Sequence, residues 1–109
     1  MARTPIHPGE ILAGELEEIG ISAAGLARTL EVPPNRISQI LAGKRAISAD
    51  TALRLARYFG TSADLWMNLQ KTYDLDLARK SVGRAIQHIP RRPQTAAPAM
   101  ERRRRVEHR

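Results

Sequence analysis

Residues 26–44 read LARTLEVPPNRISQILAGK, and this stretch decides the predicted fold. Apolar residues recur at helical spacing on both sides of a short break that holds Pro33 and Pro34. Pro34 suits the first turn of a helix, because the N–H that proline lacks would have no helical partner there. The stretch therefore predicts two short helices joined by a tight turn. That is the arrangement of a helix-turn-helix, whose second helix lies in the DNA major groove.

The flanking sequence predicts further helices and no sheet. Ser22 and Ser48 are good N-caps, Gly20 and Gly60 are helix-stop signals, and TSAD at residues 61–64 matches a capping box. No segment shows the period-two alternation of a strand. We therefore expect an all-α domain of five helices. Four are expected at about residues 8–18, 23–30, 34–42 and 49–58, and the fifth is expected to follow the capping box that opens at Thr61 and to extend past Lys80.

Composition limits the class of protein. The chain has 109 residues, enough for one compact domain, and it is 42% hydrophobic but only 4% aromatic, so Leu, Ile and Ala must build the core. It has no Cys, which excludes disulfides and Cys-based zinc sites. No apolar run is long enough to span a bilayer, and the N-terminus lacks the apolar segment of a signal peptide. We expect a cytosolic protein with no metal, no cofactor and no enzymatic activity.

Positive charge is concentrated near the C-terminus. The net charge is +7, with 11 Lys/Arg against 9 Asp/Glu in residues 1–89 and 7 Arg against 2 Glu in residues 90–109. We expect a folded domain over residues 1–88 and a disordered Arg-rich tail over residues 89–109, because the tail has too little apolar surface to fold. The run of four arginines at 102–105 is typical of a solvated tail, or of an arm that binds DNA or RNA without reading sequence.

The second helix of the motif has the pattern of a DNA reader. On a helical wheel Ile37, Ile40 and Leu41 share one face, and the opposite face is polar. Amide side chains can pair with adenine and arginine with guanine. An ordinary amphipathic surface helix is the alternative. The candidate base-reading residues are Asn35, Arg36, Ser38 and Gln39, and the candidate phosphate-binding residues are Ser22, Lys44 and Arg45.

Two positions depart from a common helix-turn-helix pattern. Glu31 occupies the turn position where glycine is usual, so either it adopts a strained positive φ, at about 1 kcal/mol, or the turn differs. Pro33 precedes the second helix of the motif, where Ser or Thr often provides a capping oxygen. The first N–H groups of that helix are then left to water or to a phosphate.

Two further groups of residues have a structural and a functional interpretation. HPGE at residues 7–10 is typical of a helix start, and we prefer this to a metal or catalytic site. Trp66 is interpreted as a buried core anchor rather than an exposed interface anchor. It lies on the last predicted helix with Leu69, Tyr73 and Leu77, which form either part of the core or a dimer seam.

Residues 21–66 resemble the helix-turn-helix of the phage-repressor-like (XRE) class. Several separate blocks narrow the resemblance to the HigA-type antitoxins of type II toxin–antitoxin modules. They are HPGEIL (7–12), VPPNRIS (32–38), GKRAISADTALRL (43–55), FGTS (59–62) and WMNLQ (66–70). The similarity covers about residues 6–77.

The resemblance implies a bacterial repressor that is also an antitoxin. Such a protein would bind its own double-stranded operator as a homodimer and so regulate its operon. It would also neutralise a RelE-like, mRNA-cleaving ribonuclease toxin of the same operon by direct binding. A cytoplasmic, nucleoid-associated protein with no membrane partner is implied. The alternative is an orphan XRE-family regulator with no cognate toxin.

Overall fold

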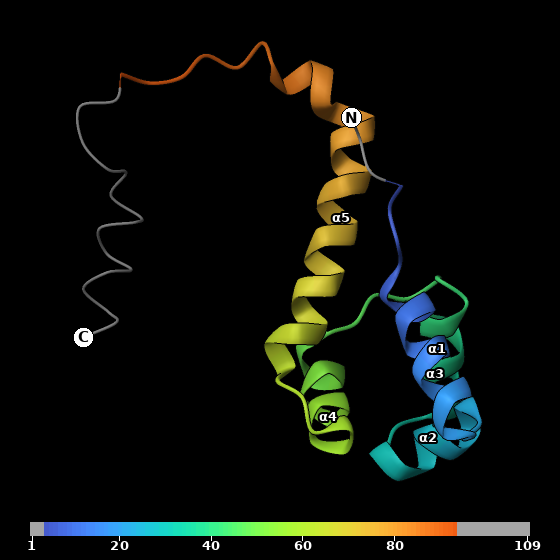
Figure 1. Ribbon diagram of the computed structural model, residues 1–109. Coiled ribbons are helices and arrows are strands. Elements are labelled where there is room, and N and C mark those ends of the chain that lie inside the picture. The colour runs from blue at the N-terminus through green and yellow to red at the C-terminus, as the bar shows by residue number, and fades with distance from the viewer. Residues whose placement is uncertain (1–3, 94–109) are drawn as a thin grey trace, which may run out of the picture.

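The structure, a computed structural model, describes residues 4–93. Within that range the chain forms five helices and no strand (Figure 1). The all-α prediction is confirmed, and the fifth helix, predicted to pass Lys80, ends at Ile86. Residues 94–109 of the predicted tail lie outside the described residues. The helices are α1 (Pro8–Ile19), α2 (Ala23–Leu30), α3 (Pro34–Leu41), α4 (Ala49–Phe59) and α5 (Ala63–Ile86).

Serine caps start three of the five helices. The hydroxyls of Ser22, Ser48 and Ser62 accept from backbone N–H groups in the first turns of α2, α4 and α5. Each such cap stabilises its helix by about 1 kcal/mol. The capping box predicted from Thr61 is wrong by one residue, because Ser62 is the cap. The Thr61 hydroxyl instead accepts from the indole N–H of Trp66 at 3.0 Å.

A histidine caps α1. The Nδ1 atom of His7 accepts from the Gly9 N–H at 2.8 Å, and the Glu10 carboxylate accepts from the His7 N–H at 3.3 Å. The imidazole is buried and makes an edge-to-face contact with Tyr73 of α5, with ring centroids 4.8 Å apart. The HPGE segment therefore starts a helix and fixes it against α5, which agrees with its structural interpretation.

The core is aliphatic and lies where the first four helices and the start of α5 meet. Figure 1 shows α1, α2 and α3 packed together and α4 next to the start of α5. Burying one Leu or Ile side chain contributes about 1.5–3 kcal/mol. The buried hydrophobic residues are Leu12, Leu16, Leu26, Ala27, Leu30, Val32, Ile37, Ile40, Ile47, Ala52, Leu55 and Trp66.

The first turn of α1 approaches the end of α3 very closely. A Cβ atom on Gly9 would lie 1.9 Å from the carbonyl oxygen of Ile40, so only glycine fits this position. The contact fixes the angle at which α3 leaves the core, and it therefore orients the helix that carries the predicted base-reading residues.

The helix α5 is only partly packed. Its 24 residues include two buried ones, Trp66 and Gln70, both near its start. At 1.5 Å per residue the helix is about 36 Å long, and its second half extends beyond the other helices (Figure 1). Leu69 and Tyr73 are half-buried, whereas Leu77 is 43% exposed. Among residues 4–93, none of the helices combines the length and the hydropathy that a bilayer-spanning segment needs.

One buried amide holds the loop between α3 and α4 to α5. The Gln70 side-chain oxygen accepts from the backbone N–H of Ile47 at 2.7 Å, and its amide nitrogen donates to Asp74 at 3.0 Å. Sequence reasoning missed this residue, because a lone Gln on a helix carries no pattern.

Candidate nucleic-acid interface

The apolar face of α3 is buried and its polar face is open. Ile37 and Ile40 have no exposed surface. On the opposite face Asn35 and Ser38 are exposed and Gln39 is half-buried. We call Asn35, Ser38 and Gln39 the amide ridge. Its amides can donate and accept at a base edge, and the Ser38 hydroxyl, which donates to the Asn35 carbonyl at 3.3 Å, still has acceptor capacity.

The start of α3 has no side-chain cap. Pro33 is the N-cap residue and makes no capping hydrogen bond, as the sequence predicts. Pro34 has no N–H, and the Arg36 N–H donates to the Pro33 carbonyl at 3.0 Å. The Asn35 N–H, at the start of the amide ridge, is therefore left for solvent or an anionic ligand.

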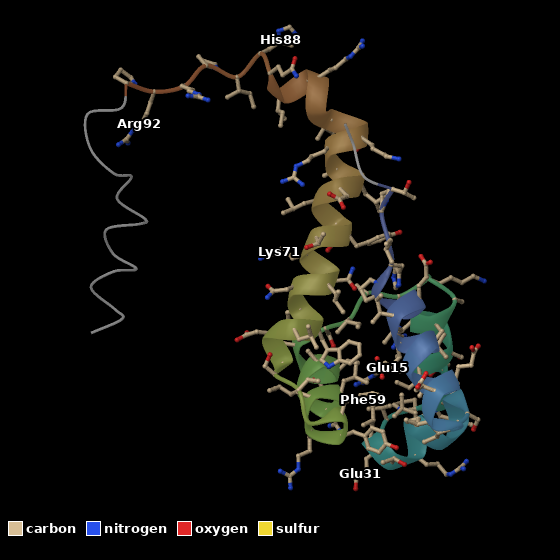
Figure 2. All side chains as sticks on the ribbon, in the orientation of Figure 1. Glu15, Glu31, Phe59, Lys71, His88 and Arg92 are labelled. Atoms are coloured by element: carbon tan, nitrogen blue, oxygen red, sulfur yellow. The ribbon has the colours of Figure 1, made fainter. Side chains whose placement is uncertain are left out.

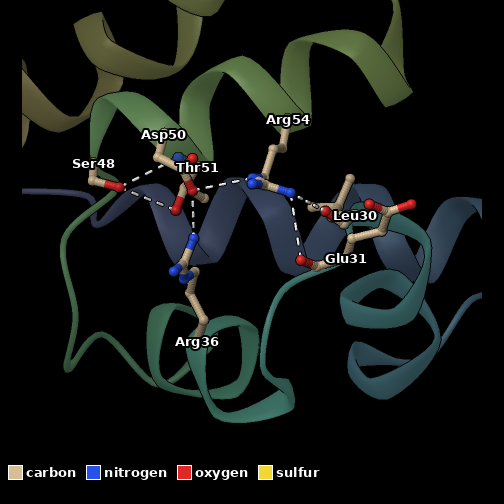
Figure 3. A network of polar contacts seen from close by, with 7 residues as sticks. All are labelled: Leu30, Glu31, Arg36, Ser48, Asp50, Thr51 and Arg54. Atoms are coloured by element: carbon tan, nitrogen blue, oxygen red, sulfur yellow. Dashed lines mark hydrogen bonds and ion pairs between the residues drawn. The ribbon is translucent and has the colours of Figure 1, made fainter.

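Arg36 borders the amide ridge but is held by another helix. Its guanidinium donates to the carboxylate of Asp50 on α4 at 2.5 Å (Figure 3), and its side chain is 27% exposed. The sequence predicted Arg36 as a base-reading residue, and the structure gives that side chain a partner 14 residues along the chain. To bind a base, the Arg36 guanidinium must either leave the Asp50 carboxylate or bind the base and the carboxylate together.

The same carboxylate connects to the turn of the motif. The Nε atom of Arg54 donates to Asp50 at 3.1 Å, and its Nη1 atom donates to the carbonyls of Leu30 at 2.7 Å and Glu31 at 3.4 Å (Figure 3). Asp50, Arg54 and Arg36 thus form a polar clamp between α4, the turn and α3.

The polar clamp binds the backbone next to the strained residue of the turn. Glu31 has φ 60° and ψ 46° and is the only non-glycine residue with positive φ in residues 4–93. The first of the two alternatives for the turn is therefore correct: Glu31 adopts the left-handed conformation, at a cost of about 1 kcal/mol. The hydrogen bonds from Arg54 hold the carbonyls on both sides of this strained link.

The polar clamp also affects the titration of Asp50. Hydrogen bonds from the Arg54 and Arg36 side chains lower the pKa of this carboxyl below its ordinary value of 3.8. The carboxylate is therefore charged at neutral pH and offsets the positive charge of Arg36 beside the amide ridge.

The predicted phosphate-binding residues are exposed, and they lie at the start of α2 and in the loop after α3. Ser22 is exposed at the start of α2, where its hydroxyl caps the helix through the Gly25 N–H at 3.0 Å. Lys44 and Arg45 are exposed in the loop that follows α3. The Lys44 N–H donates to the Gln39 carbonyl at 2.9 Å, which keeps this basic loop against the last turn of α3.

Comparisons with known proteins agree with this geometry. A family model described as "Helix-turn-helix" matches residues 13–66. Virulence-associated protein I of Dichelobacter nodosus is 54% identical over 76 residues, which are 69% of this chain and 70% of that protein. A HigA-family addiction module antidote protein from Coxiella burnetii superposes with a TM-score of 0.81 at 49% identity, covering 84% of this chain and 100% of that one.

A second similar structure is that of the antitoxin HigA of Pseudomonas aeruginosa, solved with the higBA promoter. It has a TM-score of 0.78 at 50% identity and covers 81% of this chain and 97% of that chain.

The fold and the open polar face of α3 define a helix-turn-helix protein of the phage-repressor-like (XRE) class, a class of DNA-binding transcriptional regulators. The sequence blocks and the solved relatives are more specific. The chain belongs to the HigA-type antitoxins.

Proposed function

We propose that this protein represses its own operon by placing α3 in the major groove of an operator. The observation that carries the proposal is the solvent-open amide ridge on a helix whose opposite face is fully buried. Asn35, Ser38 and Gln39 read base edges, and Arg36 joins them when it exchanges its carboxylate partner for a base. The similar Pseudomonas aeruginosa antitoxin, solved with promoter DNA, supports this direction.

Three residues outside the amide ridge position the protein on phosphates. Lys44 and Arg45 extend the surface beyond the end of α3, and Ser22 with the start of α2 lies on the other helix of the motif. Contacts of this type fix orientation and carry no sequence information.

The DNA-binding unit is a homodimer. Two copies related by a two-fold axis would read half-sites about one helical turn apart in a near-palindromic operator. Exposed apolar side chains on α5 support it, because a helix with few buried residues has surface left for a second copy. They are Leu65, Met67, Leu75, Leu77, Val82 and Ile86.

Binding of the promoter upstream of the chain's own gene tests the repressor function. Asn35→Ala and Gln39→Ala should each lose about 1–3 kcal/mol of discrimination between that duplex and a scrambled one. Asn68→Ala removes an exposed amide on α5 and is the matched control. A promoter preference that survives both ridge substitutions would exclude the assigned reading surface.

The second proposed activity is neutralisation of an mRNA-cleaving, RelE-like toxin by direct binding. Membership of the HigA-type antitoxins supports it. Co-expression with the product of the adjacent gene provides the test: we expect rescue of growth and a complex that survives gel filtration. A harmless neighbour that does not co-purify would leave an orphan XRE-family regulator.

A further inference from the structure

Three basic side chains lie on α3 or in the loop directly after it, and one of them has a carboxylate partner. Lys44 and Arg45 are exposed and, within residues 4–93, pair with no acidic side chain. Arg36 is half-buried, and its Nη1 atom donates to the Asp50 carboxylate at 2.5 Å (Figure 3). The first two side chains can therefore bind any phosphate, whereas the charge of Arg36 is already offset.

The carboxylate that pairs with Arg36 is itself fixed in place. Asp50 lies in the first turn of α4, and the hydroxyl of Ser48 caps that turn. The Oδ2 atom that accepts from Arg36 also accepts from Nε of Arg54 at 3.1 Å. Arg54 in turn donates to the Leu30 carbonyl at 2.7 Å. The carboxylate therefore stays where it is and keeps a positive partner when Arg36 moves.

The pairing of Arg36 is not what holds the turn between α2 and α3. The carbonyls of Leu30 and Glu31 in that turn accept from Arg54. Among the described residues, Arg36 donates to neither carbonyl. The Glu31 side chain is exposed at the edge of the molecule (Figure 2) and forms no ion pair with Arg36. The contact between Asp50 and Arg36 therefore acts on α3 and its outer face, where the amide ridge lies.

We infer that Asp50 is a positioning residue that sets DNA specificity through Arg36: it keeps this arginine from binding backbone phosphates and leaves it to bind a guanine edge. The inference rests on the proposed operator binding, in which Arg36 reads a base. A phosphate that approached Arg36 would also meet the Asp50 carboxylate, and like charges repel. The edge of guanine is neutral, and its O6 and N7 atoms match the guanidinium fork. The contact with Asp50 engages one guanidinium nitrogen, Nη1, so other N–H donors remain for the base.

The experiment uses the full chain and the variants Asp50→Asn, Arg36→Ala, Lys44→Ala and the double variant of Asp50 and Arg36. Dissociation constants are measured against salt concentration for the duplex upstream of the gene and for a scrambled duplex of equal length. Asp64→Asn is the matched control, because Asp64 is an exposed acid in the first turn of α5 and its loss changes the net charge equally. Melting curves followed by circular dichroism set a temperature at which every variant is folded.

On scrambled DNA, Arg36→Ala should leave the log–log salt slope unchanged, because the paired arginine neutralises no phosphate. Lys44→Ala should make the slope shallower by about 0.9, the value for one phosphate contact. Asp50→Asn should make it steeper by about 0.9, because the unpaired arginine gains a phosphate. That steepening should vanish in the double variant and be absent in Asp64→Asn.

The affinity of Asp50→Asn for scrambled DNA should rise by about 5-fold at about 0.15 M salt, which is the gain from one phosphate at that slope. No phosphate is gained on the promoter duplex, where Arg36 binds a base. The promoter preference, which is the ratio of the two dissociation constants, should therefore fall by about the same factor. A purely structural role of Asp50 would instead weaken binding to both duplexes.

Three results would overturn the inference. They are a shallower slope in Arg36→Ala on scrambled DNA, an unchanged slope in Asp50→Asn, and an equal steepening with and without Arg36, which would assign the effect to the charge of Asp50 alone. A parent that shows no promoter preference contradicts the proposed function, and the slopes on scrambled DNA still test whether Asp50 keeps Arg36 from phosphates.

Discussion

Replacing Gln70 with Met should destabilise the fold far more than a substitution at an exposed position of α5. The Gln70 side chain is 5% exposed, and its oxygen accepts from the Ile47 N–H at 2.7 Å. Methionine keeps the length of the side chain but removes the acceptor, so a buried N–H loses its partner. We expect a loss of about 2–3 kcal/mol, the sum of one hydrogen bond and the desolvation of that N–H.

The second hydrogen bond of Gln70 provides an internal comparison. Its amide donates to Asp74, which is exposed, so water can replace the acceptor in Asp74→Ala. We expect that variant, and the surface control Gln87→Met, to stay within about 0.5 kcal/mol of the parent.

Urea unfolding followed by the fluorescence of Trp66 provides the assay, at one fixed protein concentration because a dimer links stability to concentration. A loss of 2–3 kcal/mol corresponds to a fall in the melting temperature of about 8–20 °C for a domain of this size. If Gln70→Met unfolds within about 0.5 kcal/mol of the parent, the view that this amide holds the loop between α3 and α4 is refuted.

Three further predictions follow from the backbone and the polar clamp. Gly9→Ala should destabilise the protein by at least about 2 kcal/mol in urea unfolding, because the methyl group would overlap the Ile40 carbonyl at 1.9 Å; parent-like stability would show that α1 and α3 separate without cost. Glu31→Gly should stabilise by about 0.5–1 kcal/mol, because glycine relieves the strain at φ 60°. Glu17→Gly, in the middle of α1, should instead lose about 1 kcal/mol, and equal effects at the two sites would contradict the strain. A lowered pKa means that the Asp50 carboxylate stabilises the fold above its ordinary value of 3.8 and loses this effect as pH falls through the lowered pKa. Asp50→Asn should therefore be less stable than the parent at neutral pH and approach it below about pH 4; a constant difference in a pH series of melting curves would count against the polar clamp.

The sequence predicts the helices well because their signals are local. Ser22 and Ser48 cap α2 and α4 as the sequence predicts, and Glu31 has the αL conformation, one of the two conformations that the sequence allows for the turn. The missed start of α5 has a local cause too: Thr61 and Ser62 are both capping residues, and the indole of Trp66 takes the Thr61 hydroxyl. A helical wheel does not indicate which of two adjacent hydroxyls a tertiary contact will use.

The candidate site was predicted less completely. The wheel places Asn35 and Gln39 on the open face of α3 with Ser38 beside them, and the role of these residues as base readers stays a prediction. It gives no partner for Arg36, because that partner lies on another helix. The pair of Asp50 and Arg54, four residues apart, is readable from the sequence as a helical ion pair. The hydrogen bonds from Arg54 to the turn span 23 and 24 residues and depend on how α4 packs.

One carboxylate oxygen, Oδ2 of Asp50, accepts hydrogen bonds from two arginines. Arg36 borders the amide ridge, whereas Arg54 binds the turn between α2 and α3. A substitution at position 36 that changes DNA preference would therefore also change the pairing of Asp50 with Arg54, the arginine that binds the turn between α2 and α3. Variants selected for a new operator would need accompanying changes on α4, a helix that contains none of the residues assigned to DNA. In this protein the evolution of binding preference and the maintenance of a folded state are not independent.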